Sequence, residues 1–314
     1  MSGVYLGIDI GGSAVKWTTL GSSGPPGAVE SLATAGGPEL LLMQLREIRD
    51  LAAARDGEPC GVCIGTPGPV DSSGAIRGEA VNLPEWGDRP IREIVEEALQ
   101  VATVVKNDTN LALVAESLLG AAAGRNHVMG VFIGTGIGGG LFLNGALYEG
   151  FRGLAGEIGH TVVNREGPPC PCGQRGCLEC YASARGIAER TARRAGEFHT
   201  PLAETAKFHE DGPSMPEFFR HLAAGDALAV AVFDEAAHAL AQAIGVAVTT
   251  IAPEMVVLGG GVTEGHPALL EEVRRRLPLY TLPAIGTQTT IEAATLGYRA
   301  GAIGASLFAQ RALG

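Results

Sequence analysis

The sequence predicts an α/β protein built from two similar halves. Strand-like apolar segments alternate with amphipathic helices along the 314 residues, a pattern typical of helices packed on sheets. A strand, a glycine turn and a second strand occupy residues 4–20, and the same arrangement returns over residues 128–150. This recurrence indicates a duplicated architecture, and the chain length suits two domains that each bury a core.

The first half begins with two apolar segments that predict a β-hairpin around Gly11, Gly12 and Ser13. Leucine and isoleucine then recur at helical spacing over residues 38–55, which predicts a long helix. The remaining expected elements of this half are a strand over 61–65, a short helix over 89–100, a strand ending at Asn107 and Asp108, and a helix over 109–123.

The second half adds further alternating elements to its glycine-linked strands. They are a helix over 182–195, a long helix over 226–250, a buried strand over 255–261 and a helix over 266–277. An alanine-rich helix starting near Tyr298 closes the chain. We expect a small N-terminal domain over residues 1–120, joined by helix 298–314, and a larger domain over 121–297 that holds a metal-binding segment at 160–180.

Composition excludes several classes of function. The 34 acidic residues exceed the 23 lysines and arginines, giving a net charge of -11; over the protein as a whole this repels the phosphate backbone of nucleic acids, although it leaves room for a local basic patch. The N-terminus has no charged segment followed by a long apolar run, so no signal peptide is predicted. No run of 18 apolar residues lacks Gly, Pro or charge, so no membrane span is expected either. These features predict a cytoplasmic protein.

The first glycine turn is a candidate phosphate site. It comprises Asp9, Gly11, Gly12 and Ser13, and the glycines let backbone N–H groups approach a phosphate because no Cβ blocks them. Asp9 could hold Mg²⁺ through water. An ordinary hairpin turn with an exposed aspartate would give the same sequence. Lys16 lies on the next strand, where it could equally face solvent, so we assign it no role.

The second glycine turn, residues 134–139, fits the G-x-G-x-x-G pattern of dinucleotide-binding folds. That fingerprint requires a helix directly after the glycines, whereas a glycine-broken strand follows here, so we reject a dinucleotide site. The backbone and the Thr135 hydroxyl can still hold a phosphate. The residues expected to do so are Gly134, Thr135, Gly136 and Gly138.

A third glycine turn, formed by Gly259, Gly260 and Gly261, follows a strand and precedes a helix. A base and ribose could lie there against bare backbone. The three turns together resemble the arrangement of the actin/hexokinase-like (ribonuclease H-like) fold. That fold implies a duplicated two-domain protein with ATP and sugar in the interdomain cleft.

Four of the six cysteines fall within eleven residues: Cys170, Cys172, Cys177 and Cys180. In a reducing compartment so tight a cluster favours a metal over disulfides. Three of these cysteines with His160 would make a closed, tetrahedral structural zinc site. Cys180 could replace His160 in a four-cysteine site, and the spacing alone leaves both ligand sets open.

The motifs resemble those of the ROK family (repressors, open reading frames and kinases), most closely its bacterial glucokinases. In family order they are DIGGSAVK, GTPGPVD, VNLP, VKNDTN, GTGIGGG, EIGH, CPCGQRGCLE and LGGGV. The pair EIGH and CPCGQRGCLE is the most specific part. Ser13 stands where family kinases more often have threonine, and Thr109-Asn110-Leu111 replaces a commoner alanine-rich run.

The resemblance implies a role for individual side chains. Asp108 would be the catalytic base. The implied zinc ligands are His160, Cys170, Cys172 and Cys177, and the implied sugar contacts are Asn82, Asn107, Asp108, Glu157, His160 and Glu179. One ring nitrogen of His160 would bind zinc and fix the tautomer, so that the other could bond a sugar hydroxyl.

The resemblance further implies ATP-dependent phosphorylation of a hexose, with glucose favoured, by a homodimer or homotetramer. Kinases for N-acylmannosamine, N-acetylglucosamine, fructose and allose share these motifs. Polyphosphate could replace ATP, although no basic tract in the sequence favours it. A sugar-responsive transcription regulator of the same family is the alternative outside enzymes. Such regulators carry a helix-turn-helix module ahead of the first phosphate turn, and only eight residues precede Asp9 here.

Overall fold

The computed structural model describes residues 3–78, 83, 85–206 and 211–314. The chain forms two compact units. The first comprises Met1–Asn126, Leu141–Ala155 and Thr295–Gly314, and the second comprises His127–Gly140 and Gly156–Ala294. The sequence predicted the boundaries near residues 120 and 298, and it assigned residues 141–155 to the second half rather than to the first unit.

Residues 141–155 join the first unit through contacts that sequence spacing does not reveal. The Gly145 N–H donates to the carbonyl of Asn126, and the Lys106 ammonium pairs with the Glu149 carboxylate. Gly153 has a φ of 82°, and a Cβ there would lie 2.9 Å from the carbonyl oxygen of Val70. The segment is therefore fixed to the first unit by hydrogen bonds, an ion pair and close backbone packing.

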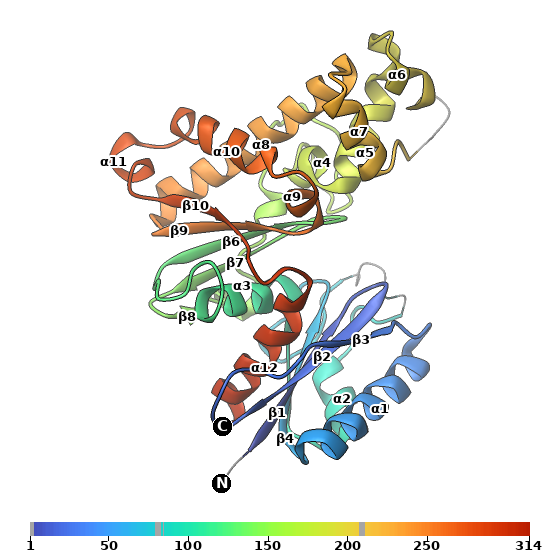
Figure 1. Ribbon diagram of the computed structural model, residues 1–314, viewed down its shortest axis with the longest axis vertical. Coiled ribbons are helices and arrows are strands. Elements are labelled where there is room, and N and C mark those ends of the chain that lie inside the picture. The colour runs from blue at the N-terminus through green and yellow to red at the C-terminus, as the bar shows by residue number, and fades with distance from the viewer. Residues whose placement is uncertain (1–2, 79–82, 84, 207–210) are drawn as a thin grey trace. The chain divides into compact units, whose positions relative to one another are not determined.

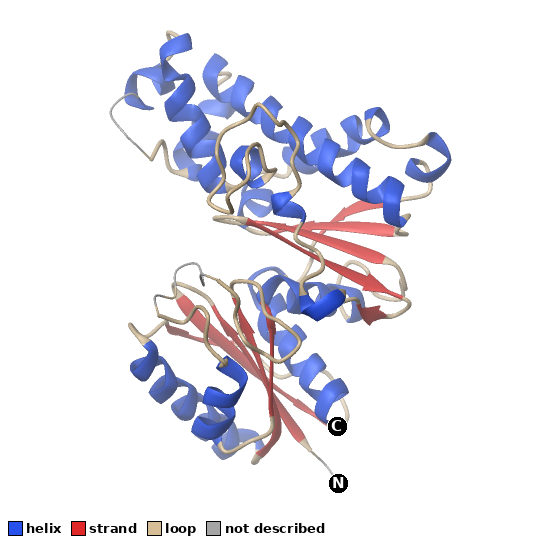
Figure 2. Cartoon of the chain, turned by 180° about the vertical axis from the view of Figure 1, so that it is seen from behind, coloured by secondary structure: helices blue, strands red, loops and turns tan. Residues whose placement is uncertain are grey.

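The sheet of the first unit has five strands (Figures 1 and 2). In spatial order they are β3 (Glu30–Ala33), β2 (Ala14–Gly21), β1 (Val4–Ile10), β4 (Pro59–Thr66) and β5 (Thr103–Asn107). β1 pairs antiparallel with β2 and parallel with β4, so the predicted hairpin lies beside a parallel half. The helices of this unit are α1 (Pro38–Asp56), α2 (Ile91–Leu99), α3 (Asp108–Leu118) and α12 (Ala300–Leu313).

Helices cover both faces of this sheet (Figure 1). Leu45 of α1 and Val95 of α2 are buried with Ile8 and Ile64 of the strands in one core, and α3 and α12 pack on the opposite face. The approach of α12 to β1 is very close. A Cβ at Gly7 would lie only 2.2 Å from the backbone nitrogen of Ser306, so this position requires glycine.

The second sheet repeats the strand order of the first. Its order is β10 (Thr290–Ala293), β9 (Met255–Gly259), β6 (Val128–Ile133), β7 (Ile137–Leu143) and β8 (Ala146–Leu147). Read from the β8 edge, the order is β8-β7-β6-β9-β10, which corresponds strand by strand to β3-β2-β1-β4-β5 in the first sheet. β6–β9 and β9–β10 are parallel, as are β1–β4 and β4–β5. This confirms the duplicated α/β architecture.

The helices of the second unit lie on one face of its strands (Figure 2). They are α4 (Glu179–Ala182), α5 (Ala184–Arg194), α6 (Pro201–Ala206), α7 (Met215–Ala223), α8 (Ala227–Ile251), α9 (Gly261–Gly265), α10 (Ala268–Arg276) and α11 (Pro283–Gly286). Among the described residues, α8 is the one helix long and apolar enough to cross a membrane, and 56% of its apolar window is buried inside the protein. Burial of that extent is typical of the central helix of a globular core.

The helix expected over residues 109–123 ends earlier than predicted, at Leu118. Glu116 accounts for this, because its side chain is fully buried and accepts a hydrogen bond from the N–H of Ala121, beyond the end of the helix. A Cβ at position 120 would lie 2.0 Å from a Glu116 carboxylate oxygen, so this arrangement requires glycine at that position.

Glu116 also anchors the chain where it enters the C-terminal helix. Its carboxylate accepts from the backbone N–H groups of Thr295 and Leu296. We expect Glu116→Ala to lower the free energy of unfolding by about 3 kcal/mol, because it leaves several buried donors without an acceptor. Urea denaturation measures this loss. Glu47→Ala, at an exposed position of α1, is the control, and equal stability of the two variants would contradict the assignment.

Candidate functional site

Asp108 lies where β5 ends and α3 begins, which is where the sequence predicted the catalytic carboxylate. The preceding Asn107 is the N-cap, and its side-chain oxygen accepts from the backbone N–H groups of Thr109 and Asn110. Asp108 Oδ1 accepts from the Thr109 N–H at 2.7 Å. The helix start thus fixes the orientation of the half-buried Asp108 side chain.

The environment of Asp108 favours its protonated form. Burial, together with the negative charge of Asp9, raises the pKa of this carboxyl to about 7, although the Thr109 N–H and Lys16 oppose the shift. A carboxyl with a pKa near neutrality is suited to accepting a proton from a substrate hydroxyl. These charges all belong to the first unit.

Asp9, the predicted magnesium ligand, lies at the end of β1 and is only 8% exposed. Its carboxylate pairs with the ammonium of Lys16 at 3.2 Å, across the register that places the two residues opposite each other. Burial raises the pKa of Asp9, and Lys16 opposes this. A Cβ at Gly301 of α12 would lie 2.5 Å from the Asp9 carboxylate, so α12 closes one side of this residue.

The turn after Asp9 projects Gly12 and Ser13 into solvent. The Gly11 N–H donates to the carbonyl of Ala14, and the hydroxyl of Thr34 donates to the carbonyl of Gly11 at 2.6 Å. Thr34 was not predicted, because it lies more than twenty residues away in sequence. The turn is held at its base and remains open at its tip, as a phosphate site requires.

Two expected sugar contacts of the first unit have different outcomes. Asn82 lies outside the described residues. Asn107 is present, but its oxygen caps α3 and its amide donates to the carbonyl of Gly68 at 3.1 Å. One amide hydrogen of Asn107 remains for a ligand, because the NH₂ group has two donors.

The second glycine turn links β6 to β7, as predicted. The Gly134 N–H donates to the carbonyl of Gly136, and the Gly134 carbonyl accepts from the N–H of Ala184. The Glu179 carboxylate accepts from the Ile137 N–H at 2.9 Å. A Cβ at Gly136 would lie 2.5 Å from that carboxylate, so the turn fits only with glycine there. Glu179, predicted as a sugar contact, therefore also touches the turn that holds Thr135.

The third glycine turn leaves backbone accessible. Gly260 has a φ of 91°, and a Cβ there would lie 2.4 Å from the carbonyl of Ile133, so it requires glycine. Gly261, the first residue of α9, is exposed and has open space beside it. Gly259 ends β9 and packs on Phe132. A flat ligand could therefore approach Gly261 without a side chain in its way.

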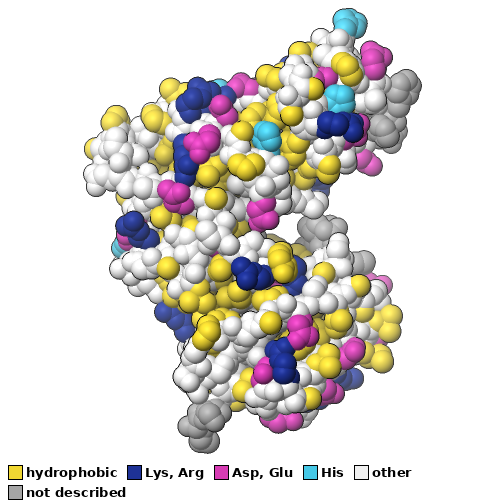
Figure 3. All heavy atoms as spheres, viewed as in Figure 1, with side chains coloured by type: hydrophobic (Ala, Val, Ile, Leu, Met, Phe, Trp, Pro, Cys, Tyr) yellow, Lys and Arg dark blue, Asp and Glu magenta, His cyan; other side chains and the backbone are white. Residues whose placement is uncertain are grey.

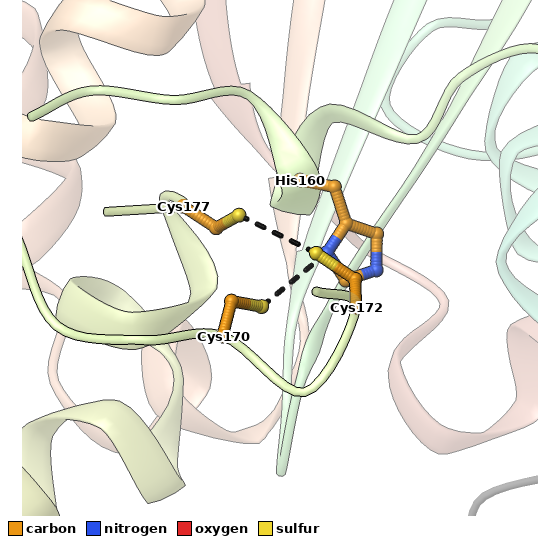
Figure 4. Close-up of side chains that lie close together, drawn as sticks. All are labelled: His160, Cys170, Cys172 and Cys177. Atoms are coloured by element: carbon orange, nitrogen blue, oxygen red, sulfur yellow. Dashed lines mark hydrogen bonds between the residues drawn. The ribbon is translucent and has the colours of Figure 1, made fainter. Parts of the chain in front are cut away.

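The predicted zinc ligands come together. His160, Cys170, Cys172 and Cys177 place their ligand atoms within 4.8 Å of one another (Figure 4). The Sγ of Cys170 lies 3.8 Å from Nδ1 of His160, and the Sγ atoms of Cys172 and Cys177 are 3.7 Å apart. Zinc–sulfur bonds of about 2.3 Å and zinc–nitrogen bonds of about 2.0 Å place neighbouring tetrahedral ligand atoms roughly 3.6–3.8 Å apart. The four residues therefore fit a zinc ion.

The geometry also distinguishes the two ligand sets that the sequence left open. The Sγ of Cys180 lies against the carbonyl of Pro169, and Cys180 is not among the four clustered residues. His160 directs Nδ1 toward the sulfur atoms, whereas Nε2 points away from them (Figure 4). The cluster is thus one histidine and three cysteines, and Nε2 is not directed at it.

Gly159 explains how His160 reaches this place. It belongs to the short 3-10 helix η2 (Ile158–His160), and a Cβ at Gly159 would lie 2.2 Å from the carbonyl of Ile137 in the second turn. Glu157 directly precedes η2. Desolvation of its carboxyl by the surrounding protein raises its pKa, His160 opposes the shift and Glu179 adds to it. Glu157, His160 and Glu179 therefore influence one another electrostatically, and all three belong to the second unit.

The chain resembles known proteins over almost its whole length. A family model described as "ROK family" matches residues 5–312. A glucokinase of Halalkalibacterium halodurans is 33% identical over 96% of this chain and 93% of its own. An N-acetylmannosamine kinase of Citrobacter koseri is 35% identical over 77% and 78%, respectively. A xylose repressor of Bacillus spizizenii is 27% identical, and the match covers 59% of its length.

Solved structures give the same result. A ROK hexokinase from Thermus thermophilus has a TM-score of 0.81 and 34% identity, covering 98% of this chain and 97% of its own. A ROK family glucokinase from Streptomyces griseus, solved with glucose and AMPPNP, has a TM-score of 0.80 and 28% identity, covering 98% and 100%. The two-domain hexokinase-like fold predicted from the glycine turns is thereby confirmed.

Proposed function

The chain belongs to the ROK family, and on this basis we propose that it is a kinase that transfers the γ-phosphoryl group of ATP to a hexose, most readily glucose. The observation that carries the proposal is Asp108, a half-buried carboxyl with a pKa near 7 at the start of a helix. The fit to zinc and the three glycine turns support it. The glucokinase names of full-length relatives support glucose over other hexoses.

In the proposed reaction Asp108 accepts the proton of the attacking hydroxyl as the oxygen–phosphorus bond forms. A sugar hydroxyl is a poor nucleophile, so a positioned carboxylate within hydrogen-bond reach assists it. Most of the acceleration would come from aligning the two reactants and neutralising phosphate charge. ADP leaves as the bond between the β–γ bridging oxygen and the γ-phosphorus breaks.

The glycine turns would hold the nucleotide. Asp9 is a single buried carboxylate beside an open turn, which suits Mg²⁺, since that ion keeps several waters and binds through one or two carboxylates and the phosphates. Thr135 and the backbone around it would bind phosphate oxygens, and Gly261 would receive the nucleoside. Basic and acidic side chains are interspersed on the face seen in Figure 3, and no continuous basic stripe there favours polyphosphate as donor.

His160, Cys170, Cys172 and Cys177 would hold a zinc ion that orients the sugar contacts and takes no part in the chemistry. Four protein ligands would leave no open position for a substrate. Holding Nδ1 of His160 fixes the ring, so that Nε2 presents a defined hydrogen bond to a hydroxyl. Glu157 and Glu179 would accept hydrogen bonds from neighbouring hydroxyls.

A screen of sugar-phosphate formation tests the proposal. The purified protein, with Mg²⁺ and zinc, is offered glucose, N-acetylmannosamine, N-acetylglucosamine, fructose and allose, each with ATP and with polyphosphate. We expect glucose with ATP to give the highest kcat/KM. Turnover with another hexose would correct the substrate, turnover with polyphosphate alone would correct the donor, and no sugar phosphate in any combination would refute the kinase.

The activity should depend on the protonation of Asp108. Because the deprotonated carboxylate is the active form and its pKa is about 7, kcat/KM should fall about tenfold per pH unit below pH 7 and level off above it. The acid limb of the pH profile measures this. Since Lys16 lowers the pKa of Asp108, Lys16→Met should shift the midpoint to higher pH. A midpoint near pH 4 in the wild type would contradict the assignment.

A further inference from the structure

Arg185 lies in the first turn of α5 and was not among the predicted site residues. We propose that Arg185 is a positioning residue for the turn Gly134–Gly138, which it holds in shape through Glu179. The inference deepens the proposed function, because it rests on that turn being a phosphate-binding site for ATP. All residues involved belong to the second unit.

Glu179 connects the two partners. One carboxylate oxygen accepts from the Ile137 N–H at 2.9 Å, and the other accepts from the guanidinium of Arg185 at 2.6 Å. The side chain of Glu179 is 14% exposed, whereas that of Arg185 is 41% exposed. A largely buried carboxylate is thus shared between a backbone N–H of the glycine turn and a cation at its rim.

The geometry allows Glu179 little freedom while this arrangement holds. Gly136 provides the space that the carboxylate occupies, since a Cβ there would lie 2.5 Å from it. The main chain next to Arg185 is itself fixed to the turn, because the Ala184 N–H donates to the carbonyl of Gly134 at 2.9 Å. Ser183 caps the start of α5 by accepting from the Gly186 N–H. Arg185 is therefore held beside the turn by its own helix.

Loss of the guanidinium removes the charged partner of one Glu179 oxygen. A mostly buried carboxylate with a single remaining donor gains by turning toward water, and the Ile137 N–H then loses its acceptor. The turn would sample more conformations, and ATP would have to select the competent one, which weakens binding. The ion pair itself is partly exposed and contributes little to global stability. Binding should therefore change more than folding.

The test measures binding of a non-hydrolysable ATP analogue to the metal-replete protein without sugar. We expect Arg185→Ala to raise the Kd about fivefold to tenfold, and Arg185→Lys to restore most of the affinity because it keeps the cation. Hydrogen exchange should be faster in the peptide containing Ile137 in Arg185→Ala. Zinc content and the melting temperature should stay close to wild type.

Arg193→Ala is the matched control, because Arg193 lies on the same helix and shares the Glu189 carboxylate with Arg185, at 3.6 Å and 4.0 Å respectively, but has no ion pair with Glu179. It should bind the analogue within twofold of wild type. Wild-type affinity in Arg185→Ala, or equal losses in both alanine variants, would overturn the inference. If Arg185→Ala does not fold, Arg185→Gln replaces it in the binding measurement. Wild-type affinity in Arg185→Gln would then overturn the inference. Because binding is measured without turnover, a wild type that binds ATP but phosphorylates no hexose would refute only the proposed function.

Discussion

Asp108→Asn should reduce kcat by a factor of at least about 10³ while hexose affinity stays near wild type. Asparagine has the same shape, and its side-chain oxygen can still accept from the Thr109 N–H. The N-cap of α3 is the preceding Asn107, so the helix start should remain intact. Asparagine cannot take up a proton from the substrate hydroxyl, so the chemical step alone should suffer. Steady-state kinetics and sugar binding, measured on the same preparation, separate these effects.

Asp50→Asn is the control for this substitution, because it makes the same chemical change at an exposed position of α1. It should retain wild-type kcat and hexose affinity. A rate above about a tenth of wild type in Asp108→Asn would mean that another group accepts the proton. Loss of sugar binding together with loss of turnover would instead place Asp108 mainly in the sugar contact.

Local features of the fold and site followed from the sequence because short-range chemistry determines them. The hairpin around Gly11, the strand ending at Asn107 and the strand–turn–helix at Gly260 are set by apolar alternation and glycine. The pairing of β1 with β4 and of β6 with β9 then brings residues at strand ends to one edge of each sheet. The strand order itself repeats, which the two glycine hairpins had indicated.

The features that were missed depend on residues distant in sequence. Nothing near Gly301 indicates that its missing side chain makes room for Asp9, almost 300 residues earlier. Thr34 and Arg185 are ordinary polar residues in sequence, and only the fold brings them to glycine turns. Glu116 ended α3 early for the same reason, since its partners at Thr295 and Leu296 lie at the other end of the chain. Helical propensity carries no information about such contacts.

The cysteine cluster gives the second large prediction. Cys172→Ser should abolish stoichiometric zinc binding and weaken hexose affinity at least about tenfold, because a serine hydroxyl is a poor replacement for a thiolate ligand. Without the ion, His160 would lose the bond that fixes its ring, and the segment from Cys170 to Cys177 would lose its metal-mediated connection to η2. That segment leads directly into Glu179, so the second glycine turn should loosen as well. Metal analysis and sugar binding measure the two losses independently.

Cys180→Ser is the control for Cys172→Ser. Cys180 belongs to the same run of cysteines, but its sulfur lies outside the cluster. This variant should keep one zinc per chain and wild-type hexose affinity. Retention of zinc by Cys172→Ser with loss of zinc by Cys180→Ser would exchange the two residues in the ligand set. Loss of zinc in Cys172→Ser with hexose affinity unchanged would confirm Cys172 as a zinc ligand but contradict a role of the metal in sugar binding. Sugar binding would then not depend on a zinc-bound His160 ring.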